Sequence, residues 1–565
     1  MKDKPLYEVR KIRDLRDMLK QSVELYGDQP AFMEKAARNL PYSNITMKEY
    51  AEDIDAFGTA LLNQVSKGSR VAILAETRYE WYVSYLSVTN GTGVVVPLDK
   101  ELPSQEIANL LNRAEADILI YSASKQKTVD EIRNDIPGVK NFICMDRLQE
   151  RDDILFFEDM MVKGRKLLAN GDRTFLDAPI DPEAMTILLF TSGTTSEAKA
   201  VMLSQKNVCA NLEGMSSMVY IGPGDVFLSV LPLHHSYECT CGFLCPIYRG
   251  ATIAICEGLR YILPNIQESK PTIILVVPLM LEMFHRNIMK KAKADQKMAR
   301  KFELGQKATK SLLSLGIDLR RKVFSEVIDN LGGNLRMLIS GGAAADPKIL
   351  SDMQDMGIAA IQGYGLTECA PILALNRDVD FNNHAAGLPL PGVELKVINQ
   401  DENGIGEIVG RGPNIMLGYY KNPEATAEAI DEDGFYHTGD LGYIDDNGFC
   451  IITGRKKNVI VSKNGKNIFP EEIESLLGHS PYVAESVISG EDSQRDDIII
   501  TATIFPDMEV VKEKLGPEPA QKDIQNLLEK EVQKVNEQLV SYKNIRQVIY
   551  RDTEFEKTTS RKIRR

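Results

Sequence analysis

The segment LLFTSGTTSEAKAVMLS, residues 188–204, passes from an apolar run into hydroxyl side chains and one glycine, and a lysine follows shortly after. Hydroxyls can donate hydrogen bonds to phosphate oxygens, glycine lets the backbone approach closely, and lysine supplies positive charge. A loop of the kinase or GTPase type would need glycine at position 198 and Ser or Thr at position 200, where this chain has Ala198 and Ala200. The segment therefore predicts a phosphate-binding loop of another kind, with a polar strand-to-helix turn as the structural alternative. Its candidate residues are Thr191, Ser192, Gly193, Thr194, Thr195 and Lys199.

Two segments further along the chain carry residues that suit a nucleoside. In ISGGAAADP, residues 339–347, an apolar run leads into Gly341 and Gly342, which would admit a flat ligand against the backbone. In YHTGDLGYID, residues 436–445, Asp440 can accept hydrogen bonds from both hydroxyls of a ribose, as acidic residues do in other nucleotide sites. The structural alternatives are a tight turn for the first segment and a hairpin-turn aspartate for the second.

The segment IQGYGLTECAP, residues 361–371, combines an aromatic ring with a carboxylate. Tyr364 lies between two glycines, the second of which is Gly365, so its ring can stack on a base. Thr367 and Glu368 follow, and their hydroxyl and carboxylate can reach a phosphate and its Mg²⁺. The segment therefore predicts base and metal contacts from a single stretch of chain.

Basic residues mark two places nearer the C-terminus. GRKKNVIVSKNGKNIFPEEIE, residues 454–474, carries the basic residues Arg455 and Lys457 at an expected domain boundary. TTSRKIRR, residues 558–565, places Lys562 in a short basic run on an acidic chain. A solvated basic tail is the alternative interpretation of Lys562, because disorder is the default for the last residues of a domain.

The composition of the 565-residue chain limits the classes of function. Its net charge of -13 argues against nucleic acid as the main partner, since phosphate backbones bind clustered positive charge. Eight cysteines do not make a disulfide framework in a chain of this length. Cys239, Cys241 and Cys245 lie near two histidines but lack the second, separated ligand pair of a zinc site, so buried thiols in a reducing cytosol are expected.

The sequence also bears on location. Its first twenty residues are charged throughout, and we expect no signal peptide. No apolar run approaches the roughly 20 residues that a membrane span needs. We therefore expect a soluble, cytoplasmic protein, and a peripheral contact with a membrane surface stays open.

The elements that must position the candidate residues follow an α/β pattern over the first four-fifths of the chain. Short Val/Ile/Leu runs bounded by turn residues alternate with helical stretches, which is typical of strands buried in α/β layers. Trp81, the one tryptophan, is expected in a core helix without a role in a site. The expected strands include residues 70–74, 93–99, 116–122, 272–278 and 335–342, and the expected helices include residues 106–116 and 287–302.

Turn-forming residues become frequent after about residue 390. Asp-Gly and Asn-Gly pairs between apolar runs are typical of hairpins. We expect a small β subdomain over about 390–456, within a large N-terminal domain of residues 1–456. Pro470, followed by two glutamates, is a favourable helix start in a smaller α+β domain of residues 457–565. The predicted fold class is α/β, with stacked α/β sheets in the large domain.

Taken together, the five segments resemble in order and spacing the motifs of the adenylate-forming superfamily of acyl-CoA synthetases, firefly luciferase and peptide-synthetase adenylation domains. The resemblance runs from about residue 25 to the C-terminus. It implies an enzyme in which a carboxylate attacks the α-phosphate of ATP, giving acyl-AMP and pyrophosphate, while a mobile C-terminal domain turns between two half-reactions. A carboxylate and a triphosphate repel each other, so such a site must neutralise charge and align the reactants.

The resemblance implies roles around the phosphates. The loop within residues 188–204 would bind the β- and γ-phosphates of ATP. Thr367 would contact the α-phosphate, and Glu368 would hold Mg²⁺. Lys457 would be the hinge of the C-terminal domain, and Lys562 would span the attacking carboxylate and the α-phosphate.

The resemblance implies further roles around the nucleoside. Gly341 and Gly342 would border the adenine, on which Tyr364 would stack. Asp440 would bind the ribose with help from Arg455. These assignments connect the segments that suit a nucleoside with the base and sugar of ATP.

The chain departs from the superfamily pattern at four positions. Ser196 follows TSGTT where glycine is usual, and Ala198 and Ala200 flank the lysine where the pattern is PKG. Each change in the loop is to a small residue, so we expect ATP binding to survive. Arg561 replaces the glycine before the final lysine and adds charge beside it.

The segment LPLHHSYECTCGFL, residues 231–244, lies where the superfamily lines its acyl pocket. Members that activate amino acids carry an aspartate there, whereas this chain has His234, His235 and Ser236, so an α-amino acid substrate is disfavoured. We expect His235 near the substrate carboxylate, with a structural histidine as the alternative.

This segment and VVPLMLEMF, residues 276–284, resemble long-chain acyl-CoA synthetases. Met280, Met283 and Phe284 are candidates for an alkyl tunnel, because methionine adapts to flexible chains. Packing in the core of a helix is the alternative for each of the three.

The resulting hypothesis is a ligase that uses ATP and Mg²⁺ to activate a medium- or long-chain fatty acid and passes the acyl group to CoA. A fatty acyl-AMP ligase that loads a phosphopantetheinyl carrier protein is an alternative, since both acceptors share the same thiol arm. A non-catalytic acyl or nucleotide sensor is a second alternative, and retention of the catalytic residues argues against it. A homodimer stays open.

Overall fold

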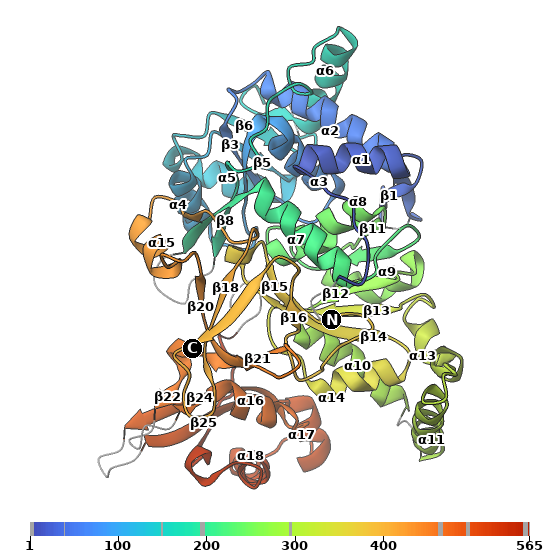
Figure 1. Ribbon diagram of the computed structural model, residues 1–565, viewed down its shortest axis with the longest axis vertical. Helices are drawn as coiled ribbons and strands as arrows, with labels where there is room; N and C mark the ends of the chain where they lie inside the picture. The colour runs from blue at the N-terminus through green and yellow to red at the C-terminus, as the bar shows by residue number, and fades with distance from the viewer. Residues whose placement is uncertain are drawn as a thin grey trace.

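The computed structural model describes residues 5–38, 40–148, 151–191, 198–292, 296–461, 467–492, 498–557 and 563, without the side chains of 296–298, 301 and 492. Figure 1 shows a large body formed by the first four-fifths of the chain and a smaller C-terminal lobe below it. Five of the predicted site residues lie outside the described residues, and they are Ser192, Gly193, Thr194, Thr195 and Lys562.

The large body contains a nine-stranded sheet in the order β16-β15-β14-β13-β12-β10-β11-β1-β2. Its central strands β10, β12, β13 and β14 are parallel to one another, and the antiparallel β15 and β16 extend one edge. Parallel strands are continuous apolar runs because both faces of the sheet are covered. The strands are β1 (Pro30–Glu34), β2 (Ser43–Thr46), β10 (Val226–Ser229), β11 (Thr252–Ile255), β12 (Ile273–Val276), β13 (Met337–Ser340), β14 (Ala359–Gly365), β15 (Ile372–Leu375) and β16 (Leu388–Pro389).

A second sheet of eight strands has the order β19-β9-β8-β4-β3-β5-β6-β7. The short strand β19 arrives from far along the chain and covers the outer edge of β9, antiparallel to it. The strands are β3 (Ser69–Leu74), β4 (Gly93–Pro97), β5 (Ile118–Tyr121), β6 (Asn141–Cys144), β7 (Leu155–Phe156), β8 (Met185–Thr191), β9 (Lys199–Ser204) and β19 (Gly418–Tyr419).

The predicted small β subdomain is present as a four-stranded antiparallel sheet in the order β17-β18-β20-β21. Its strands are β17 (Glu394–Ile398), β18 (Gly406–Arg411), β20 (Tyr436–Ile444) and β21 (Cys450–Arg455). The Asp-Asp-Asn-Gly and Asp-Glu-Asp-Gly sequences that predicted hairpins lie in turns before β21 and β20.

The C-terminal lobe is built on a three-stranded sheet, β24-β25-β26, with a separate two-stranded pair, β22-β23. Its buried core contains Ile473, Leu477, Ile504 and Leu528 and is distinct from the two clusters of the large body. The strands are β22 (Ile460–Val461), β23 (Asn467–Ile468), β24 (Val483–Asp492), β25 (Ile498–Pro506) and β26 (Gln547–Tyr550), and the helices are α16 (Pro470–Gly478), α17 (Met508–Leu515) and α18 (Gln521–Asn536).

Helices pack around both sheets of the large body (Figure 1). Trp81 is buried in α3, as predicted, and stacks on Tyr85. The predicted helix over 106–116 corresponds to α4, and the one over 287–302 corresponds to the end of α10 and the start of α11, between which residues 293–295 lie outside the described residues. The helices are α1 (Leu15–Tyr26), α2 (Met47–Leu62), α3 (Tyr79–Ser87), α4 (Ser104–Ala114), α5 (Gln126–Ile132), α6 (Phe157–Ala169), α7 (Gln205–Met218), α8 (Cys245–Arg249), α9 (Ile262–Ser269), α10 (Pro278–Ala292), α11 (Gln296–Leu313), α12 (Arg320–Val323), α13 (Ser325–Asn330), α14 (Pro347–Asp355) and α15 (Pro423–Ala429).

The fold class predicted from the sequence is confirmed, and the five predicted strands correspond to β3, β4, β5, β12 and β13. All eight cysteines are buried as free thiols. Among the described residues, none of the helices combines the length and the apolar character needed to cross a bilayer.

Candidate functional site

Three of the predicted segments lie at the carboxyl ends of neighbouring parallel strands. The segment containing His235 follows β10, Gly341 and Gly342 follow β13, and Tyr364 lies near the end of β14. In open α/β sheets, ligands bind in the crevice beyond the carboxyl ends of the strands. The topology therefore brings together segments that are distant in the sequence.

Three residues from three of the predicted segments form one hydrogen-bonded group. The hydroxyl of Tyr364 donates to Oδ2 of Asp440 at 2.6 Å, and Nε of Arg455 lies 2.7 Å from Oδ1 of the same carboxylate. Asp440 and Arg455 are paired across β20 and β21, which fixes their separation. Asp440 is buried while the Arg455 side chain is partly exposed, so the buried carboxylate has a charged partner that reaches solvent. Burial and the neighbouring Asp440 raise the pKa of Tyr364 well above its ordinary value, so the phenol stays a hydrogen-bond donor.

Glu368 lies in a second group with a residue that the sequence analysis missed. The hydroxyl of Tyr419 donates to Oε1 of Glu368 at 2.9 Å, and the Lys199 ammonium lies 4.6 Å from the centre of the Tyr419 ring. Tyr419 reaches this position because β19 pairs with β9, with Tyr419 opposite Val201. The group joins the predicted metal-binding carboxylate to the predicted phosphate-binding lysine.

The loop that contains Glu368 is anchored from several sides. The backbone N–H of Met416 donates to the carbonyl of Glu368 at 2.8 Å. The side-chain amides of Asn211 and Asn414 both donate to the carbonyls of Cys369 and Ile372. Because these carbonyls have fixed partners, the backbone that presents the carboxylate is held in one conformation.

The two ends of the predicted phosphate loop lie on paired antiparallel strands. Thr191 and Lys199 form the last pair of β8 and β9, and the Thr191 hydroxyl donates to the Lys199 carbonyl at 3.3 Å. Arg113 donates to the carbonyl of Ala198 at 2.6 Å. The strand-to-helix turn considered as an alternative is therefore wrong, because residues 199–204 form a strand. The structure places the two ends of the loop, and residues 192–197 lie outside the described residues.

The predicted nucleoside and acyl segments touch each other. The hydroxyl of Ser236 donates to the hydroxyl of Thr367 at 3.4 Å, and the Tyr237 hydroxyl donates to the carbonyl of Ile339 at 2.8 Å. A Cβ at Gly341 would lie 2.8 Å from the Tyr237 ring, so packing of the protein itself excludes a side chain there. Gly342 has a φ of +86°, a conformation that favours glycine.

Gly365 is explained by strand packing in the same way. A Cβ at this position would lie 1.9 Å from the carbonyl oxygen of Pro371 on the neighbouring segment. The close approach of these two backbone segments is enough to explain why position 365 is glycine, and no bound ligand is needed for that explanation. Its predicted contact with a nucleotide stays a prediction.

The two histidines of the acyl segment lie against each other, with ring centres 4.2 Å apart. Nε2 of His234 lies 3.5 Å from Oδ2 of Asp99, a buried residue that follows β4 and was not among the sequence candidates. Burial, His235 and Lys100 lower the pKa of His234 well below its ordinary value, so this ring is neutral at pH 7. His235 is half-buried beside it.

The acyl segment also contains a buried carboxyl group that the sequence analysis passed over. Ser229 donates to Oε1 of the buried Glu238 at 2.6 Å. A Cβ at Gly242 would lie 2.7 Å from the Glu238 carboxyl carbon, so the small residue makes room for the acid. Burial raises the pKa of Glu238 to about 8, and the group is therefore mostly neutral at pH 7. A signal for this residue was available, because it lies between HHSY and the apolar run CTCGFL.

Two of the three predicted tunnel residues are buried. Met280 and Phe284 lie on the inner face of α10, whereas Met283 is 47% exposed. Neighbouring residues of an α-helix are about 100° apart around its axis, so the face that buries Phe284 turns Met283 toward solvent. The prediction that Met283 lines the alkyl tunnel is therefore wrong.

The C-terminal candidates lie at the start and end of the lobe. Lys457 is exposed in the single turn between β21 and the lobe. Lys557 and Ile563 form a β-bridge, and the backbone N–H of Phe555 donates to the Glu485 carboxylate at 3.0 Å. The described residues on either side of Lys562 are thus attached to the lobe, and Lys562 itself lies outside the described residues.

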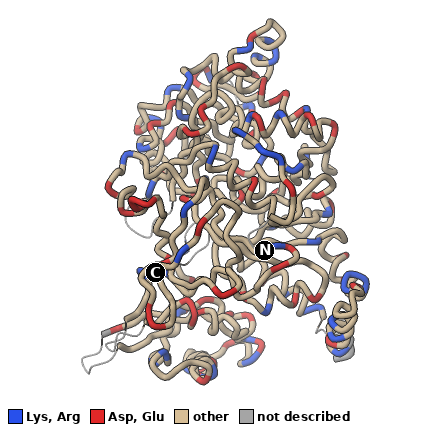
Figure 2. Tube along the Cα trace, viewed as in Figure 1, with Lys and Arg blue, Asp and Glu red and all other residues tan. Residues whose placement is uncertain are grey.

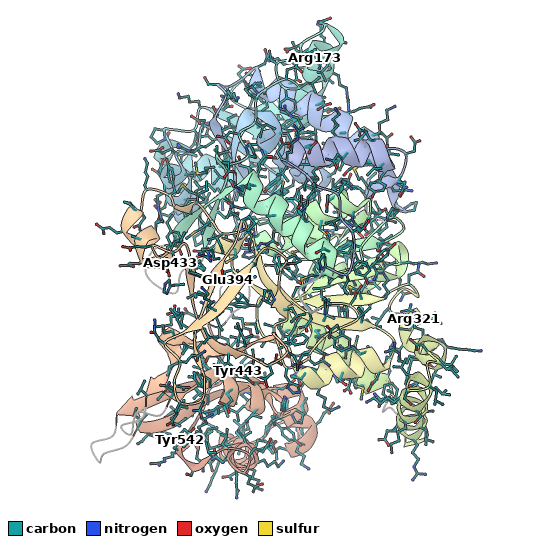
Figure 3. The ribbon with its side chains drawn as sticks, viewed as in Figure 1. Arg173, Arg321, Glu394, Asp433, Tyr443 and Tyr542 are labelled. Atoms are coloured by element: carbon teal, nitrogen blue, oxygen red, sulfur yellow. The ribbon has the colours of Figure 1, made fainter. Side chains whose placement is uncertain are left out.

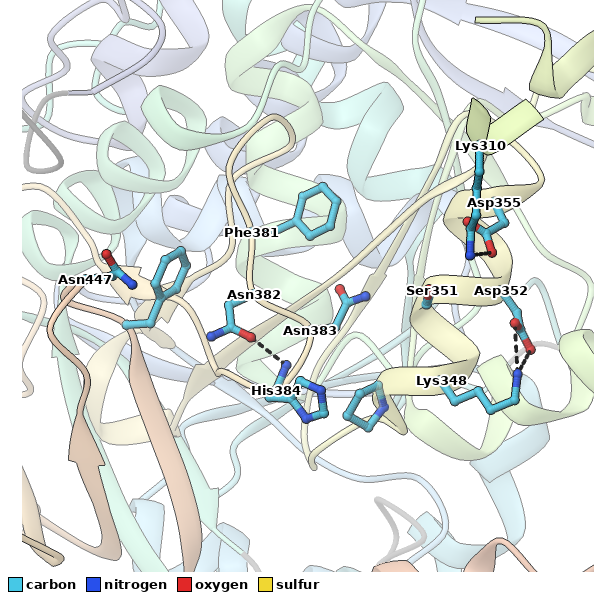
Figure 4. Close-up of a pocket in the computed structure, with 12 residues that line it drawn as sticks. Lys310, Lys348, Ser351, Asp352, Asp355, Phe381, Asn382, Asn383, His384 and Asn447 are labelled. Atoms are coloured by element: carbon cyan, nitrogen blue, oxygen red, sulfur yellow. Dashed lines mark hydrogen bonds and ion pairs between the residues drawn. The ribbon is translucent and has the colours of Figure 1, made fainter. Parts of the chain in front are cut away.

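A separate pocket of about 760 Å³ lies beside α14 (Figure 4). Its lining includes Lys310, Lys348, Asp352 and His384, and no predicted site residue. Nζ of Lys348 lies 3.1 Å from Oδ2 of Asp352, so these two charges in the pocket are paired. We assign it no part in the chemistry.

The donor set fits a magnesium ion that arrives with its nucleotide. Within the described residues there is no group of three or more His, Cys, Asp or Glu side chains arranged for a metal. Mg²⁺ commonly uses one or two carboxylates together with substrate phosphates and waters. The buried carboxylate of Glu368, connected to Lys199 through Tyr419, matches that mode of binding.

Comparison with protein families gives two matches along the chain. The sequence profile described as AMP-binding enzyme matches residues 19–420, and the profile described as AMP-binding enzyme C-terminal domain matches residues 457–565. Between them the two profiles include most of the large body and the whole C-terminal lobe.

Similar sequences and structures agree with these matches. Long-chain-fatty-acid–CoA ligase 1 of Cavia porcellus is 29% identical over 537 residues, covering 90% of this chain and 76% of the ligase. Fatty acyl-CoA synthetase A of Dictyostelium discoideum is 30% identical, covering 86% and 75%. The anthranilate CoA ligase AuaEII in complex with anthranoyl-AMP superposes with a TM-score of 0.76 at 20% identity, over 100% of this chain and 96% of that one. ATP-bound MatB from Rhodopseudomonas palustris superposes with a TM-score of 0.75 at 23% identity, over 98% and 97%, and these two structures bear on the fold alone.

Proposed function

Because this chain belongs to the family of AMP-binding enzymes, we propose that it activates a medium- or long-chain fatty acid with ATP and transfers the acyl group to the thiol of CoA. The relatives named as long-chain-fatty-acid–CoA ligases support the substrate and the acceptor. The observation that carries the proposal is the presence of two groups, Tyr364–Asp440–Arg455 and Glu368–Tyr419–Lys199, beyond the carboxyl ends of the central strands.

In the first half-reaction, an oxygen of the fatty acid carboxylate attacks the α-phosphorus of ATP. The bond from the α-phosphorus to the bridging oxygen breaks, and pyrophosphate leaves with both electrons of that bond. We assign Lys199 and the hairpin loop to the β- and γ-phosphates and Thr367 to the α-phosphate. Fixed positive charge and hydrogen-bond donors at these places lower the cost of bringing two anions together.

Mg²⁺ would be held by Glu368 and would neutralise phosphate charge when bound. Tyr419 keeps the carboxylate oriented, since its hydroxyl engages one of the two carboxylate oxygens. Rotation of the carboxylate is restricted by this bond, which also sets the direction of the second oxygen. This arrangement makes Tyr419 a positioning residue for the carboxylate.

We assign Asp440 to the ribose hydroxyls and Tyr364 to one face of the adenine. The 2.6 Å hydrogen bond between them restricts rotation of the phenol ring, and Nε of Arg455, 2.7 Å from Oδ1 of Asp440, holds the carboxylate from the other side. A charged carboxylate can accept two hydroxyl donors. The ribose and base would therefore meet a surface that is ordered before ATP binds.

The acyl segment favours an aliphatic acid without an α-amine. A substrate ammonium group would need a charged carboxylate nearby, and the carboxyl of Glu238 is mostly neutral at pH 7 because burial raises its pKa to about 8. The pKa of His234 is lowered by burial, so that ring is neutral as well. We assign the substrate carboxylate to the neighbourhood of His235 and the alkyl chain to the buried face of α10.

In the second half-reaction, the CoA thiolate attacks the acyl carbon and AMP leaves. We assign Lys457 to the hinge that reorients the C-terminal lobe between the two steps, and Lys562 to the first step only. In the part of the chain that the structure describes, contacts between lobe and body include an ion pair of Arg286 with Asp507 at 3.2 Å, and Nε2 of His479 lies 3.3 Å from the Asp346 carboxylate. At least one side chain of each pair is largely exposed, and exposed pairs stabilise an interface weakly, as a lobe that changes orientation requires.

Pyrophosphate exchange into ATP, run against a panel of carboxylic acids, tests the proposal. Exchange should require a fatty acid and rise with chain length, while free amino acids should give none. Purified acyl-AMP should then discharge onto CoA, and preferential discharge onto a carrier protein would favour the acyl-AMP ligase. Absence of exchange with every acid would leave a non-catalytic sensor as the better account.

A further inference from the structure

A pair of helices at one corner of the large body has a charge opposite to that of the whole protein. We call residues 296–323, which comprise α11, α12 and their connection, the basic hairpin. It contains eight Lys and Arg residues and two acidic ones, on a chain of net charge -13. Figure 1 shows α11 projecting from the body, and Figure 2 shows the charged residues along it.

One face of α11 packs on the protein. The rings of Phe302 and Phe324 are 5.1 Å apart in an edge-to-face arrangement, and a Cβ at Gly305 would lie 3.1 Å from a methyl carbon of Val323. Thr309, four residues after Gly305, is buried. Residues 302, 305 and 309 share a helical face, so α11 is fixed in rotation and its opposite face points to solvent.

The opposite face mixes cations with exposed aliphatic side chains. Arg300, Leu304 and Lys307 follow one another at helical spacing, and Leu304 is 66% exposed. Leu315 and Ile317, just beyond the end of α11, are 75% and 48% exposed. Three large aliphatic side chains are thus exposed within 14 residues of one segment, a concentration that is typical of an interaction surface.

The cations of this outer face differ from three others on the basic hairpin. Nζ of Lys310 lies 2.7 Å from the Asp355 carboxylate, and Arg320 and Arg321 have partners in Asp318 and in the carbonyl of Leu335. Figure 3 shows Arg321 where the basic hairpin joins the body. Arg300 and Lys307 form no ion pair with any residue that the structure describes. Their charge is therefore available to a partner.

We propose that the outer face of the basic hairpin docks on the surface of a lipid bilayer that carries anionic headgroups. Interfacial helices combine basic side chains, which lie at the headgroups, with aliphatic side chains that enter the acyl boundary. Arg300 and Lys307 would meet lipid phosphates, and Leu304, Leu315 and Ile317 would insert. A surface for nucleic acid would need the cations but would not need three exposed aliphatic side chains.

The inference goes beyond the proposed function and rests on it only for the nature of the substrate. A long-chain fatty acid partitions into bilayers, so an enzyme that docks on one gains access to it. The helix α10 connects the two regions, since Met280 near its start is a predicted acyl contact and Ala292 at its end lies shortly before the basic hairpin in the sequence. At 1.5 Å per residue the two ends of α10 are about 20 Å apart.

Flotation of the full chain with vesicles tests the proposal. One set of vesicles contains equal parts phosphatidylcholine and phosphatidylglycerol, and the other contains phosphatidylcholine alone. The protein should bind the anionic vesicles and release from them as salt is raised, because the headgroup attraction is screened. Two double variants, Arg300→Glu with Lys307→Glu and Leu304→Ser with Leu315→Ser, should each lower binding about tenfold or more.

A matched control variant lies on α6, at the opposite end of the large body (Figure 1). Val162 is 61% exposed and Lys163 is exposed beside it, so Val162→Ser with Lys163→Glu repeats both kinds of change elsewhere. This variant should bind anionic vesicles like the unaltered protein. All variants should keep the thermal transition and the pyrophosphate exchange of the unaltered protein with a water-soluble medium-chain acid.

Several results would overturn the inference. They are equal binding to both kinds of vesicle, unchanged binding by the Leu304→Ser and Leu315→Ser variant, or an equal loss in the α6 control. A change of oligomeric state in the hairpin variants would instead identify a second copy of the chain as the occupant. Vesicle binding tests this inference, and pyrophosphate exchange tests the proposed function. A variant that loses vesicle binding and keeps pyrophosphate exchange therefore bears on the inference alone.

Discussion

At the scale of single residues, the site depends on hydroxyl groups that orient carboxylates. The Tyr364 hydroxyl engages Asp440, and the Tyr419 hydroxyl engages Glu368. In both cases the carboxylate is buried and its partner comes from a different segment of the chain. Replacing such a carboxylate by an amide of the same shape removes its charge and keeps the hydrogen bond that orients it. The effect of the charge can therefore be measured apart from the effect of orientation.

Glu368→Gln should reduce adenylation at least about a hundredfold while the fold is kept. The amide oxygen can still accept the hydrogen bond of Tyr419, but the charge that would hold Mg²⁺ is lost. Pyrophosphate exchange measures the loss, and a thermal melt verifies folding. Tyr419→Phe is the matched variant, which keeps the ring beside Lys199 and should lose only about tenfold. Exchange by Glu368→Gln at the unaltered rate would refute the metal assignment.

Glu238→Gln should change how stability depends on pH. The ordinary pKa of 4.5 is raised by burial to about 8, so above pH 4.5 the unfolded state releases a proton that the folded state retains. The free energy of unfolding of the unaltered protein should therefore fall as pH rises from about 5 to about 8. The amide side chain of the variant cannot ionise, so the substitution should be nearly neutral at pH 5 and stabilising at pH 8.

Urea unfolding at the two pH values measures this difference. Burial also raises the pKa of Glu34 to about 7 and that of Asp55 to about 6. The free energy of unfolding of the Glu238→Gln variant should therefore still fall as pH rises, but less steeply than that of the unaltered protein. If the free energies of unfolding of the unaltered protein and of Glu238→Gln differ by the same amount at pH 5 and at pH 8, Glu238 does not titrate as stated.

The sequence indicated more of the proposed nucleotide-binding residues than of the residues that support them. Asp440 and Tyr364 lie in segments whose residue types suggest a nucleoside, and the structure brings them together. Tyr419 and Asp99 showed no such signal, because each acts through a partner that is distant in sequence, and only the sheet topology makes them neighbours. Glu238 had a signal in the apolar run that follows it, but the burial that raises its pKa becomes visible only in the fold.

At the scale of elements, the strands were predictable and the buried faces of helices were less so. Buried strands consist of continuous apolar runs, which stand out in a sequence. The first turns of α10, in contrast, are apolar almost all round, so the residue types alone do not distinguish the inner Met280 and Phe284 from the outer Met283. The packing of the helix on its neighbours decides which side is buried.

The buried face of α10 predicts how activity varies with the acid. Each CH₂ that becomes buried contributes up to about 0.8 kcal/mol, or roughly fourfold in kcat/KM. Activity should therefore climb with chain length until the alkyl site is full. Met280→Ala should shift the preferred length upward relative to the surface control Met283→Ala, which should have no effect. A preferred length that is the same in both variants would place the alkyl chain elsewhere.

The turn at Lys457 and the tail at Lys562 predict different effects on the two half-reactions. Lys562→Ala should abolish most acyl-AMP formation and leave thioester formation from supplied acyl-AMP largely intact, because we assign its charge to the first step only. Lys457→Pro should do the reverse, since a rigid turn blocks reorientation of the lobe. Separate assays of the two half-reactions with each variant measure this. An equal loss in both halves for Lys562→Ala would favour the solvated tail.

At the scale of the whole molecule, the lobe and the body have separate cores. The buried cluster of the lobe runs from Ile468 to Ile545 and shares no residue with the clusters of the body. A fragment of residues 457–565 should therefore fold alone and unfold cooperatively on heating. Circular dichroism of the isolated fragment measures this, and a featureless melt would show that the lobe depends on the body.

The short strand β19 has a consequence for synthesis of the chain. Without Gly418 and Tyr419, the apolar strand β9 would be an open sheet edge, which is a template for pairing with other chains. The covering residues are made more than 200 residues after β9, so on a ribosome adding 5–20 residues per second the edge stays open for roughly 10–40 s. Aggregation during expression should therefore be sensitive to β19. Tyr419, which orients the carboxylate proposed to bind metal, would also end the period in which the nascent chain exposes this edge.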